Sequence, residues 1–205
     1  MAPVTIYVEG GGGERRGLQQ VRLAFREFFS EFAGSMPKVV ACGGRGAAYE
    51  DFMMAVRQSP SSAILLLVDA ERRVSGDSPT EHLADQPDNW ELRGIPDDRV
   101  HLMVQAVEAW MIADPDALRA YFGNGFNENA LPARRNPEGI PKDDLKRALV
   151  AAGRNTKKNG YHEIDDGTES LMRLDPATVR DKCVWCRRFF MVVSRVTGVA
   201  LPDLQ

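Results

Sequence analysis

The chain has 205 residues, of which 43% are hydrophobic and 27% are charged, and this composition is typical of a globular protein with one domain or one domain and a subdomain. The formal net charge of −3 excludes a strongly basic protein, so any contact with nucleic acid must come from a local patch. No apolar run approaches the roughly 20 residues that cross a bilayer. Because no secretion signal precedes the first predicted strand, we expect a cytoplasmic protein that makes no membrane contact.

The first predicted strand, Val4 to Val8, leads into a loop with four consecutive glycines. Glu9 precedes the glycines and Glu14 follows them. No Lys-Ser or Lys-Thr completes a phosphate loop, and the two acids would repel the pyrophosphate of a dinucleotide, so the loop favours a cation. Glu14 alone is equally well explained as an acid that interacts with the dipole of the next helix. The glycines that leave room for a substrate to approach are Gly10, Gly11 and Gly12.

Strand and helix patterns alternate in the next segment. A second strand is predicted at Lys38 to Cys42, a helix at Ala47 to Gln58, and a third strand at Ile64 to Val68. This alternation predicts a parallel sheet with right-handed crossovers. The third strand is apolar without alternation, as expected for a strand that is buried on both faces.

Two carboxylates, Asp69 and Glu71, follow the third strand. In extended geometry residues i and i+2 point to the same side, so both would lie beyond the carboxyl end of a central strand, where open α/β sheets bind ligands. Two like charges at this separation raise each other's pKa, and a divalent cation with oxygen ligands is the simplest way to stabilise them. The alternative is a strand that ends in an ordinary polar loop.

The fourth predicted strand, Val100 to Val104, precedes an apolar helix with Glu108 in its first turn. That position also suits an acid that interacts with the helix dipole. In a parallel sheet, however, the strands end at one shared edge. Glu9, Asp69, Glu71 and Glu108 would therefore converge on a Mg²⁺ or Mn²⁺ site, and the expected chemistry is metal-assisted phosphoryl transfer.

The remainder of the chain is predicted to be helical and locally basic. The basic segment runs from Arg134 to Lys158, and it is either a solvated helical face or a patch that contacts phosphate. Cys183 and Cys186 have the spacing of a zinc knuckle but lack a second pair of ligands, so buried inert thiols are favoured over a zinc or redox site. Helices are predicted at Lys142 to Ala151, Thr168 to Leu174 and Pro176 to Val196.

The strand-end acids resemble those of the Toprim fold, which topoisomerases, bacterial primases, recombination mediators and overcoming-lysogenization-defect nucleases share. Toprim proteins have a glutamate after the first strand and an Asp-x-Asp pair after the third. Here Glu9 and Asp69-Ala70-Glu71 stand at those positions, with Glu in place of the second Asp. More narrowly, Val8-Glu9-Gly10, Leu67 to Glu71 and Met103 to Trp110 resemble the bacterial domain-of-unknown-function family 4276, which is grouped with RloB-like Toprim proteins.

The resemblance implies an α/β fold with a Toprim-like, Rossmann-like, mostly parallel four-stranded sheet flanked by helices. It implies a Toprim-like domain at residues 1–122 and a helical C-terminal extension at residues 123–205 that packs on it. It also implies roles for individual residues: Glu9 as a general base or metal ligand, Asp69 and Glu71 as metal ligands, Glu14 and Glu108 as further members of the metal shell, and Lys158 as a phosphate contact.

The function expected from this resemblance is a Mg²⁺- or Mn²⁺-dependent nuclease that acts on DNA or RNA. An ABC-type ATPase is the expected partner, since members of such branches neighbour ATPases in phage-defence loci. A non-catalytic Toprim-like module that docks an ATPase or nucleic acid is the first alternative. Nucleotidyl transfer of the primase type is the second, although no nucleotide-recognition element is visible.

Overall fold

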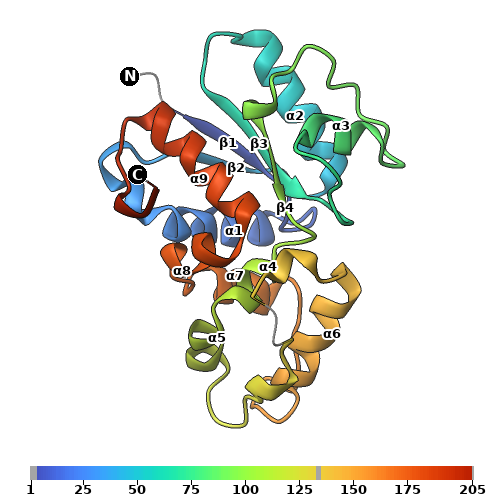
Figure 1. Cartoon of the computed structure of the whole chain (residues 1–205), viewed down its shortest axis with the longest axis vertical. Coiled ribbons are helices and arrows are strands. Elements are labelled where there is room, and N and C mark those ends of the chain that lie inside the picture. The colour runs from blue at the N-terminus through green and yellow to red at the C-terminus, as the bar shows by residue number, and fades with distance from the viewer. Residues whose placement is uncertain (1–3, 133–134, 205) are drawn as a thin grey trace.

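A computed structural model describes residues 4–132 and 135–204, and within them four parallel strands form one sheet (Figure 1). The strands are β1 (Thr5–Val8), β2 (Lys38–Ala41), β3 (Ile64–Asp69) and β4 (Val100–Met103). The α-helices are α1 (Arg15–Phe28), α2 (Arg45–Gln58), α3 (Pro79–Ala84), α4 (Glu108–Ala113), α5 (Pro115–Phe122), α6 (Lys142–Gly153), α7 (Asp165–Leu171), α8 (Pro176–Lys182) and α9 (Val184–Thr197). The 3-10 helices are η1 (Ser30–Ser35), η2 (Asp97–Arg99), η3 (Glu128–Ala130), η4 (Pro137–Gly139) and η5 (Pro202–Leu204).

The strands follow the order β2-β1-β3-β4, and every pairing is parallel. This confirms the predicted α/β fold with a four-stranded parallel sheet. β3 lies between β1 and β4 with all of its residues buried, which explains its apolar run. The chain passes from β1 to β2 at one edge and then returns to β3 on the other side of β1, so the direction of winding changes between β1 and β3.

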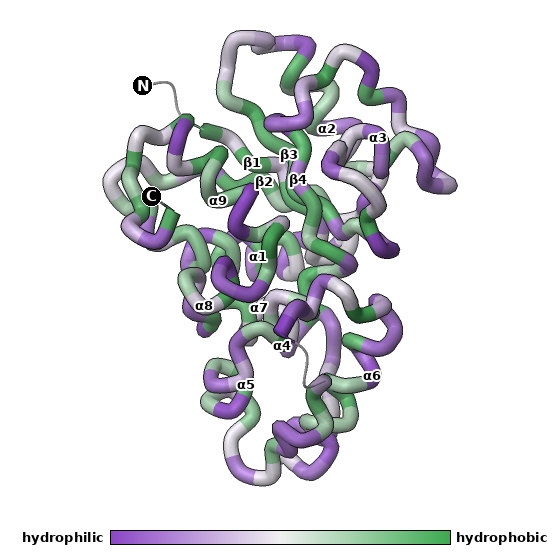
Figure 2. The backbone as a smooth tube through the Cα atoms, in the orientation of Figure 1, coloured by the Kyte–Doolittle hydropathy of each residue, from purple (hydrophilic) through white to green (hydrophobic). Residues whose placement is uncertain are grey.

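Helices cover both faces of the sheet, and β3 shows how the two faces are separated. Leu65 and Leu67 pack into a core with residues of α1, α4 and α9. The alternate residues Ile64, Leu66 and Val68 pack against α2, α3 and the loop before β4. In Figure 2 the strands are mostly green, the helices beside them alternate between green and purple, and long purple segments lie in the outer loops. The sheet is therefore the middle layer of three.

The second half of the chain encloses the carboxyl end of the sheet. α5 and α6 form the lower end of the molecule in Figure 1, and α4 contacts both of them. α7 contacts α1, and α9 returns to pack on β4. One hydrophobic core includes Phe28 and Trp110 together with Phe189 and Phe190. The division at residue 122 stays a prediction.

Two of the predicted C-terminal helices differ in the structure. α7 runs from Asp165 to Leu171 and so lies three residues earlier than the predicted helix from Thr168 to Leu174. The Asp166 carboxylate in its first turn accepts a hydrogen bond from the His162 N–H at 2.8 Å and holds the preceding loop to the helix. The predicted helix over residues 176–196 is two helices. Arg134, the first residue of the predicted basic segment, lies outside the described residues.

The break between α8 and α9 lies at Cys183, whose backbone is extended (φ −117°, ψ 104°). The Glu138 carboxylate accepts a hydrogen bond from the Trp185 N–H at 3.0 Å. It thereby gives a partner to a backbone N–H in the first turn of α9 that has none within the helix. Cys183 and Cys186 are both buried, and burial raises the pKa of both thiols. Within residues 4–132 and 135–204, no helix combines the length and apolar character needed to cross a membrane.

Candidate metal centre

The predicted acids lie where the winding of the sheet reverses. Glu9 directly follows β1, Asp69 is the last residue of β3, and the two strands are neighbours in which Val8 pairs with Leu67. In open α/β sheets the crevice outside this point is the usual ligand site, because the crossover helices on either side of it diverge. The topology therefore brings together acids that are 60 residues apart in sequence.

Three carboxylates form a compact group at this point. One oxygen each of Glu9, Asp69 and Glu71 lies within 4.8 Å of the others. Oxygen ligands lie about 2.0–2.6 Å from Mg²⁺ or Ca²⁺, so three oxygens with this spacing fit around one ion. The side chains of Asp69 and Glu71 are 11% and 35% exposed, so the group is open on one side.

Backbone groups fix two of these carboxylates. Asp69 Oδ1 accepts a hydrogen bond from the Val107 N–H at 3.0 Å, and Glu9 Oε2 accepts one from the Asp69 N–H at 3.2 Å.

Asp69 and Glu71 lie together as predicted, but the predicted reason, an extended backbone that points residues i and i+2 to the same side, was wrong. β3 ends at Asp69, and Glu71 has a left-handed backbone (φ 63°) held by a hydrogen bond from its N–H to the Gln105 carbonyl at 2.9 Å.

Lys142 supplies a positive charge to the group. Its Nζ lies 3.1 Å from Asp69 Oδ2 and 2.6 Å from Glu71 Oε1. Lys142 is the first residue of α6, so the C-terminal half of the chain reaches into the acid group. The ammonium shows that the space between Asp69 and Glu71 accepts a cation, and the donor set of carboxylate oxygens suits Mg²⁺ or Mn²⁺.

Arg45 places a second cation beside Glu9. Its Nη1 donates a hydrogen bond to the Asp69 carbonyl at 2.5 Å and lies 3.7 Å from Glu9 Oε2. Asp88 pairs with the other side of the guanidinium at 2.5 Å, and the guanidinium lies 4.5 Å from the centre of the Trp90 ring. Arg45 is thus held in place from three sides while one edge faces the acids.

Burial decides the protonation of the group. Burial and, after it, the charge of Asp69 together raise the pKa of Glu9 to about 7, against the opposing effect of Arg45. Burial also raises the pKa of Asp69, although Lys142 acts in the opposite direction. The acids are therefore costly to ionise together, and a divalent cation would offset that cost.

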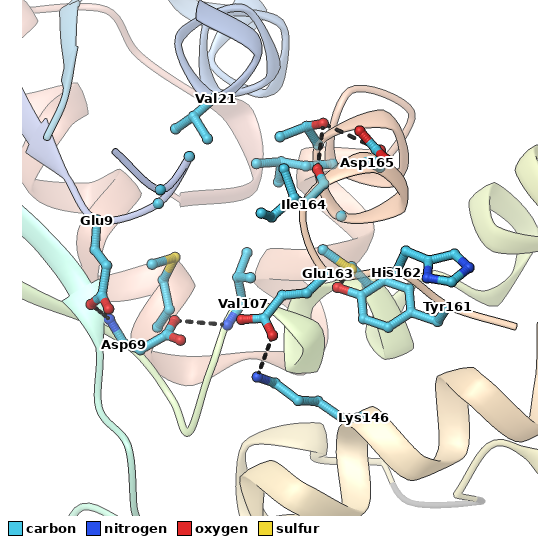
Figure 3. A pocket seen from close by; sticks show the side chains of 18 of the residues that line it. Glu9, Val21, Asp69, Val107, Lys146, Tyr161, His162, Glu163, Ile164 and Asp165 are labelled. Atoms are coloured by element: carbon cyan, nitrogen blue, oxygen red, sulfur yellow. Dashed lines mark hydrogen bonds and ion pairs between the residues drawn. The ribbon is translucent and has the colours of Figure 1, made fainter. Parts of the chain in front are cut away.

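A cleft of about 860 Å³ opens beside the carboxylates. Figure 3 shows Glu9 and Asp69 at one end, Tyr161 and His162 at the other, and Lys146 between them. Gly10, Gly11 and Gly12 of the glycine loop line the cleft, and their contact with a substrate stays a prediction. These glycines are also needed for packing, because a Cβ on Gly11 would lie 2.7 Å from the backbone of Gly17 in α1.

Three of the predicted site residues lie outside the acid group. Glu14 is exposed and directly precedes α1. This is the position expected if Glu14 is an acid that interacts with the helix dipole. Glu108 is buried at the start of α4, where it accepts a hydrogen bond from the Tyr161 hydroxyl at 3.2 Å, and burial raises its pKa to about 6. Lys158 lies over the Tyr121 ring, 3.6 Å from Asp166, and is not among the residues that line the cleft.

The sequence reasoning missed Arg45 and did not single out Lys142 among the basic residues. Arg45 follows the glycines after β2, so it lies at the same edge of the sheet as the acids, and that position was a usable signal. Lys142 carries no such signal, because its distance from the acids depends on how residues 123–141 fold back. Only the tertiary structure places it at the site.

Comparison with known proteins agrees with the predicted family. The family model described as a domain of unknown function (DUF4276) matches residues 8–193, which include the three carboxylates, Lys142 and most of α9. The match extends well past residue 122, the predicted end of the Toprim-like domain. Neither the curated proteins nor the solved structures gave a match. The chain belongs to the DUF4276 family.

Proposed function

We propose that the chain is a Mg²⁺- or Mn²⁺-dependent phosphodiesterase that cleaves DNA or RNA. The observation that carries the proposal is the group of Glu9, Asp69 and Glu71, with oxygens within 4.8 Å of one another at the switch point of the sheet. The resemblance of the same residues to Toprim sites supports it, and an ABC-type ATPase is the partner that this resemblance suggests.

The roles of the residues follow from their contacts. A divalent cation bound by the three carboxylates would neutralise charge on a phosphate and lower the pKa of a bound water. The Val107 N–H orients Asp69, and the Gln105 carbonyl fixes the backbone of Glu71. Glu9 is either the third ligand of the cation or, when it does not ligate the ion, the group that transfers a proton, since its pKa without a metal is about 7 and close to that of an effective general base.

Cleavage assays on purified protein test this proposal. Single-stranded and duplex DNA and RNA are incubated with Mg²⁺, with Mn²⁺ or with EDTA. We expect cleavage only with metal, and a loss on the order of 100-fold or more in Asp69→Asn. Asp116→Asn is the matched control, because Asp116 is an exposed acid of α5 that pairs with Arg119. Absence of cleavage with either metal, or an equal rate in Asp69→Asn, would refute the proposal.

One observation favours a second candidate, a non-catalytic module that docks an ATPase or nucleic acid. Lys142 already forms ion pairs with both Asp69 and Glu71 without a metal, so the acids could serve to attach α6 to the sheet. Calorimetric titration with Mn²⁺ separates the two candidates. Heat of binding that disappears in Asp69→Asn supports the enzyme, whereas nucleic-acid binding with no Mn²⁺ binding supports the module.

A further inference from the structure

The cleft beside the carboxylates has the dimensions of a small-molecule site. Its volume of about 860 Å³ lies within the range of about 300–1,000 Å³ that is typical of ligand pockets. It runs from Glu9 and Asp69 past Lys146 to Tyr161, between the edge of the sheet and the C-terminal helices (Figure 3). A substrate that binds at the carboxylates therefore has a defined space for its neighbouring chemical group.

The character of the cleft changes along one face of α6. Lys142, Lys146 and Val150 are spaced by four residues, so they share a face of the helix, and all three line the cleft. They span about 12 Å along the helix axis at a rise of about 1.5 Å per residue. The face thus changes from a cation at the carboxylates, to a second cation, to an apolar side chain.

The second cation is held loosely. Lys146 pairs with Glu163 at 2.7 Å, but the two side chains are 30% and 61% exposed. Exposed pairs of this kind contribute about 0–1 kcal/mol, so a phosphate can replace Glu163 as the partner of Lys146 at little cost.

The far part of the cleft is apolar and partly uncovered. Val150 and Ile164 line it and are 41% and 54% exposed, so both have apolar surface that a ligand could cover. Met111 lines the same cleft, and its sulfur lies 3.7 Å from the Tyr161 hydroxyl. The Tyr161 hydroxyl donates to Glu108, which fixes the ring. A flat aromatic group would cover these residues.

We infer that the cleft is a subsite for one nucleoside monophosphate unit with an unpaired base. The phosphate lies beside Lys142 and Lys146, and the base packs against Val150, Ile164 and Met111. The bases of a duplex are stacked and paired, so only a free nucleotide or an unpaired nucleotide of a strand can enter. The inference rests on the proposed phosphodiester chemistry and specifies its substrate class.

Calorimetric binding of AMP and of ribose 5-phosphate to the full chain, with Mg²⁺ and with EDTA, tests the subsite. The two probes share a phosphate and a sugar and differ in the base. We expect AMP to bind roughly 10-fold more tightly, because its base removes apolar surface from water when it packs on the apolar side chains of the cleft. The double variant Val150→Ser with Ile164→Ser should remove most of this difference and leave ribose 5-phosphate unchanged. The matched control changes Leu23 and Met191 to Ser, since both are about half exposed and lie outside the cleft.

A single-stranded oligonucleotide and its blunt duplex distinguish the two sources of the nucleotide. Tighter binding of the single strand than of AMP identifies a strand as the substrate, and equal binding identifies a free nucleotide; both support the subsite. No binding of AMP, equal affinity for AMP and ribose 5-phosphate, or equal affinity for duplex and single strand would overturn it. Metal-dependent cleavage without a preference for AMP would refute this inference alone, and a preference for AMP without cleavage would refute the phosphodiesterase alone.

Discussion

Glu71 combines an unfavourable backbone with a charged contact. A left-handed conformation costs a non-glycine residue about 1–2 kcal/mol, and no glycine occupies this position (φ 63°). In return the carboxylate faces Lys142 at 2.6 Å, in the group that includes Glu9 and Asp69. Backbone strain that persists at a cluster of charged groups is typical of functional sites. The left-handed backbone of Glu71 therefore does not stabilise the loop; it places the Glu71 carboxylate in the acid group.

Lys142→Met should increase the affinity for Mn²⁺ by roughly 10-fold, because a divalent cation no longer has to displace an ammonium that touches two of its ligands. In EDTA the same variant should be less stable than the wild type, since Asp69 loses its partner. Calorimetric titration and thermal unfolding measure the two effects.

Lys146→Met is the control for this prediction. It removes the same charge one helical turn away, where the partner is Glu163, and should leave the Mn²⁺ affinity within about 2-fold. Unchanged or weaker Mn²⁺ binding in Lys142→Met would show that Lys142 does not occupy the position of the cation.

The residues of the site were predictable to different degrees. Glu9 and Asp69 follow buried strands, and parallel strands end at one edge, so their proximity follows from the pattern alone. Glu108 also follows a strand, but its carboxylate accepts the hydrogen bond of the Tyr161 hydroxyl and is not part of the group of Glu9, Asp69 and Glu71. Lys142 depends on the packing of α6, about which no local pattern in the sequence is informative.

At the scale of elements, the glycine loop and α1 fit together through their backbones. A Cβ on Gly17 would lie 2.0 Å from the Gly11 carbonyl oxygen. Because this oxygen belongs to the backbone, no change of side-chain rotamer can relieve the clash. Gly17→Ala should therefore destabilise the protein by about 2 kcal/mol, although alanine in a helix is intrinsically favoured by about 1 kcal/mol. Urea unfolding measures the difference.

Gly46→Ala is the matched control for Gly17→Ala, because it adds the same methyl group to a helical glycine. Gly46 lies in the first turn of α2, and a Cβ there would meet no atom within 4 Å. The control should be neutral or slightly stabilising, by up to about 1 kcal/mol. If Gly17→Ala were also neutral or stabilising, the glycine loop could not approach the backbone of α1 as closely as described.

The junction of α8 and α9 gives a prediction about pH. Burial raises the pKa of Glu138 to about 7, although backbone N–H groups at the start of α9 lower it. Below about pH 4.5 the carboxyl is protonated in both the folded and the unfolded state. Between about pH 4.5 and 7 the unfolded state loses the proton first, so the contribution of Glu138 to stability falls as the pH rises, by roughly 3 kcal/mol in total.

Glu138→Gln removes this titration and keeps an oxygen that can accept the Trp185 N–H. The free energy of unfolding of the wild type relative to this variant should therefore decrease from pH 5 to pH 8, as measured by urea titration at both pH values. The other buried acids are common to both proteins and cancel in the comparison. A relative gain in stability for the wild type at pH 8 would mean that the helix dipole and the N–H groups outweigh burial.

The helices illustrate why element boundaries were harder to predict than element types. Apolar periodicity correctly predicted helical structure between residues 176 and 196, because α8 and α9 both bury apolar faces. The break at Cys183 is not visible in that periodicity, since it depends on Glu138, which lies far away in sequence and caps the second helix. Contacts that are distant in sequence thus set the boundary.

At the scale of the whole molecule, the two halves of the chain share one aromatic core. The Phe28 ring stacks on Trp110 at 5.3 Å and meets the edge of Phe190 at 5.5 Å, and Phe29 contacts Phe189 at 5.5 Å. Residues before and after position 122 are therefore buried against each other. The cleft lies between the same halves, so its geometry depends on this core.

Arg180 links the halves with charges. Its side chain is fully buried, pairs with Glu31 of η1 and with Asp203 of η5, and lies 4.6 Å from the centre of the Phe190 ring. Both carboxylates are about one-third exposed, so they can be rehydrated when the guanidinium is removed. Arg180→Met should therefore cost about 2 kcal/mol, less than the loss of a partner for a fully buried charge.

Because one core joins the halves, we expect calorimetry to show a single unfolding transition in the wild type, and Arg180→Met should shift it to lower temperature without splitting it. Arg119→Met is the control, since Arg119 also lies between two carboxylates but is 51% exposed, and it should change stability by less than about 1 kcal/mol. Two separate transitions in either protein would contradict the shared core. In that case residues 1–122 would fold independently, and the cleft would have to form by docking of two preformed parts.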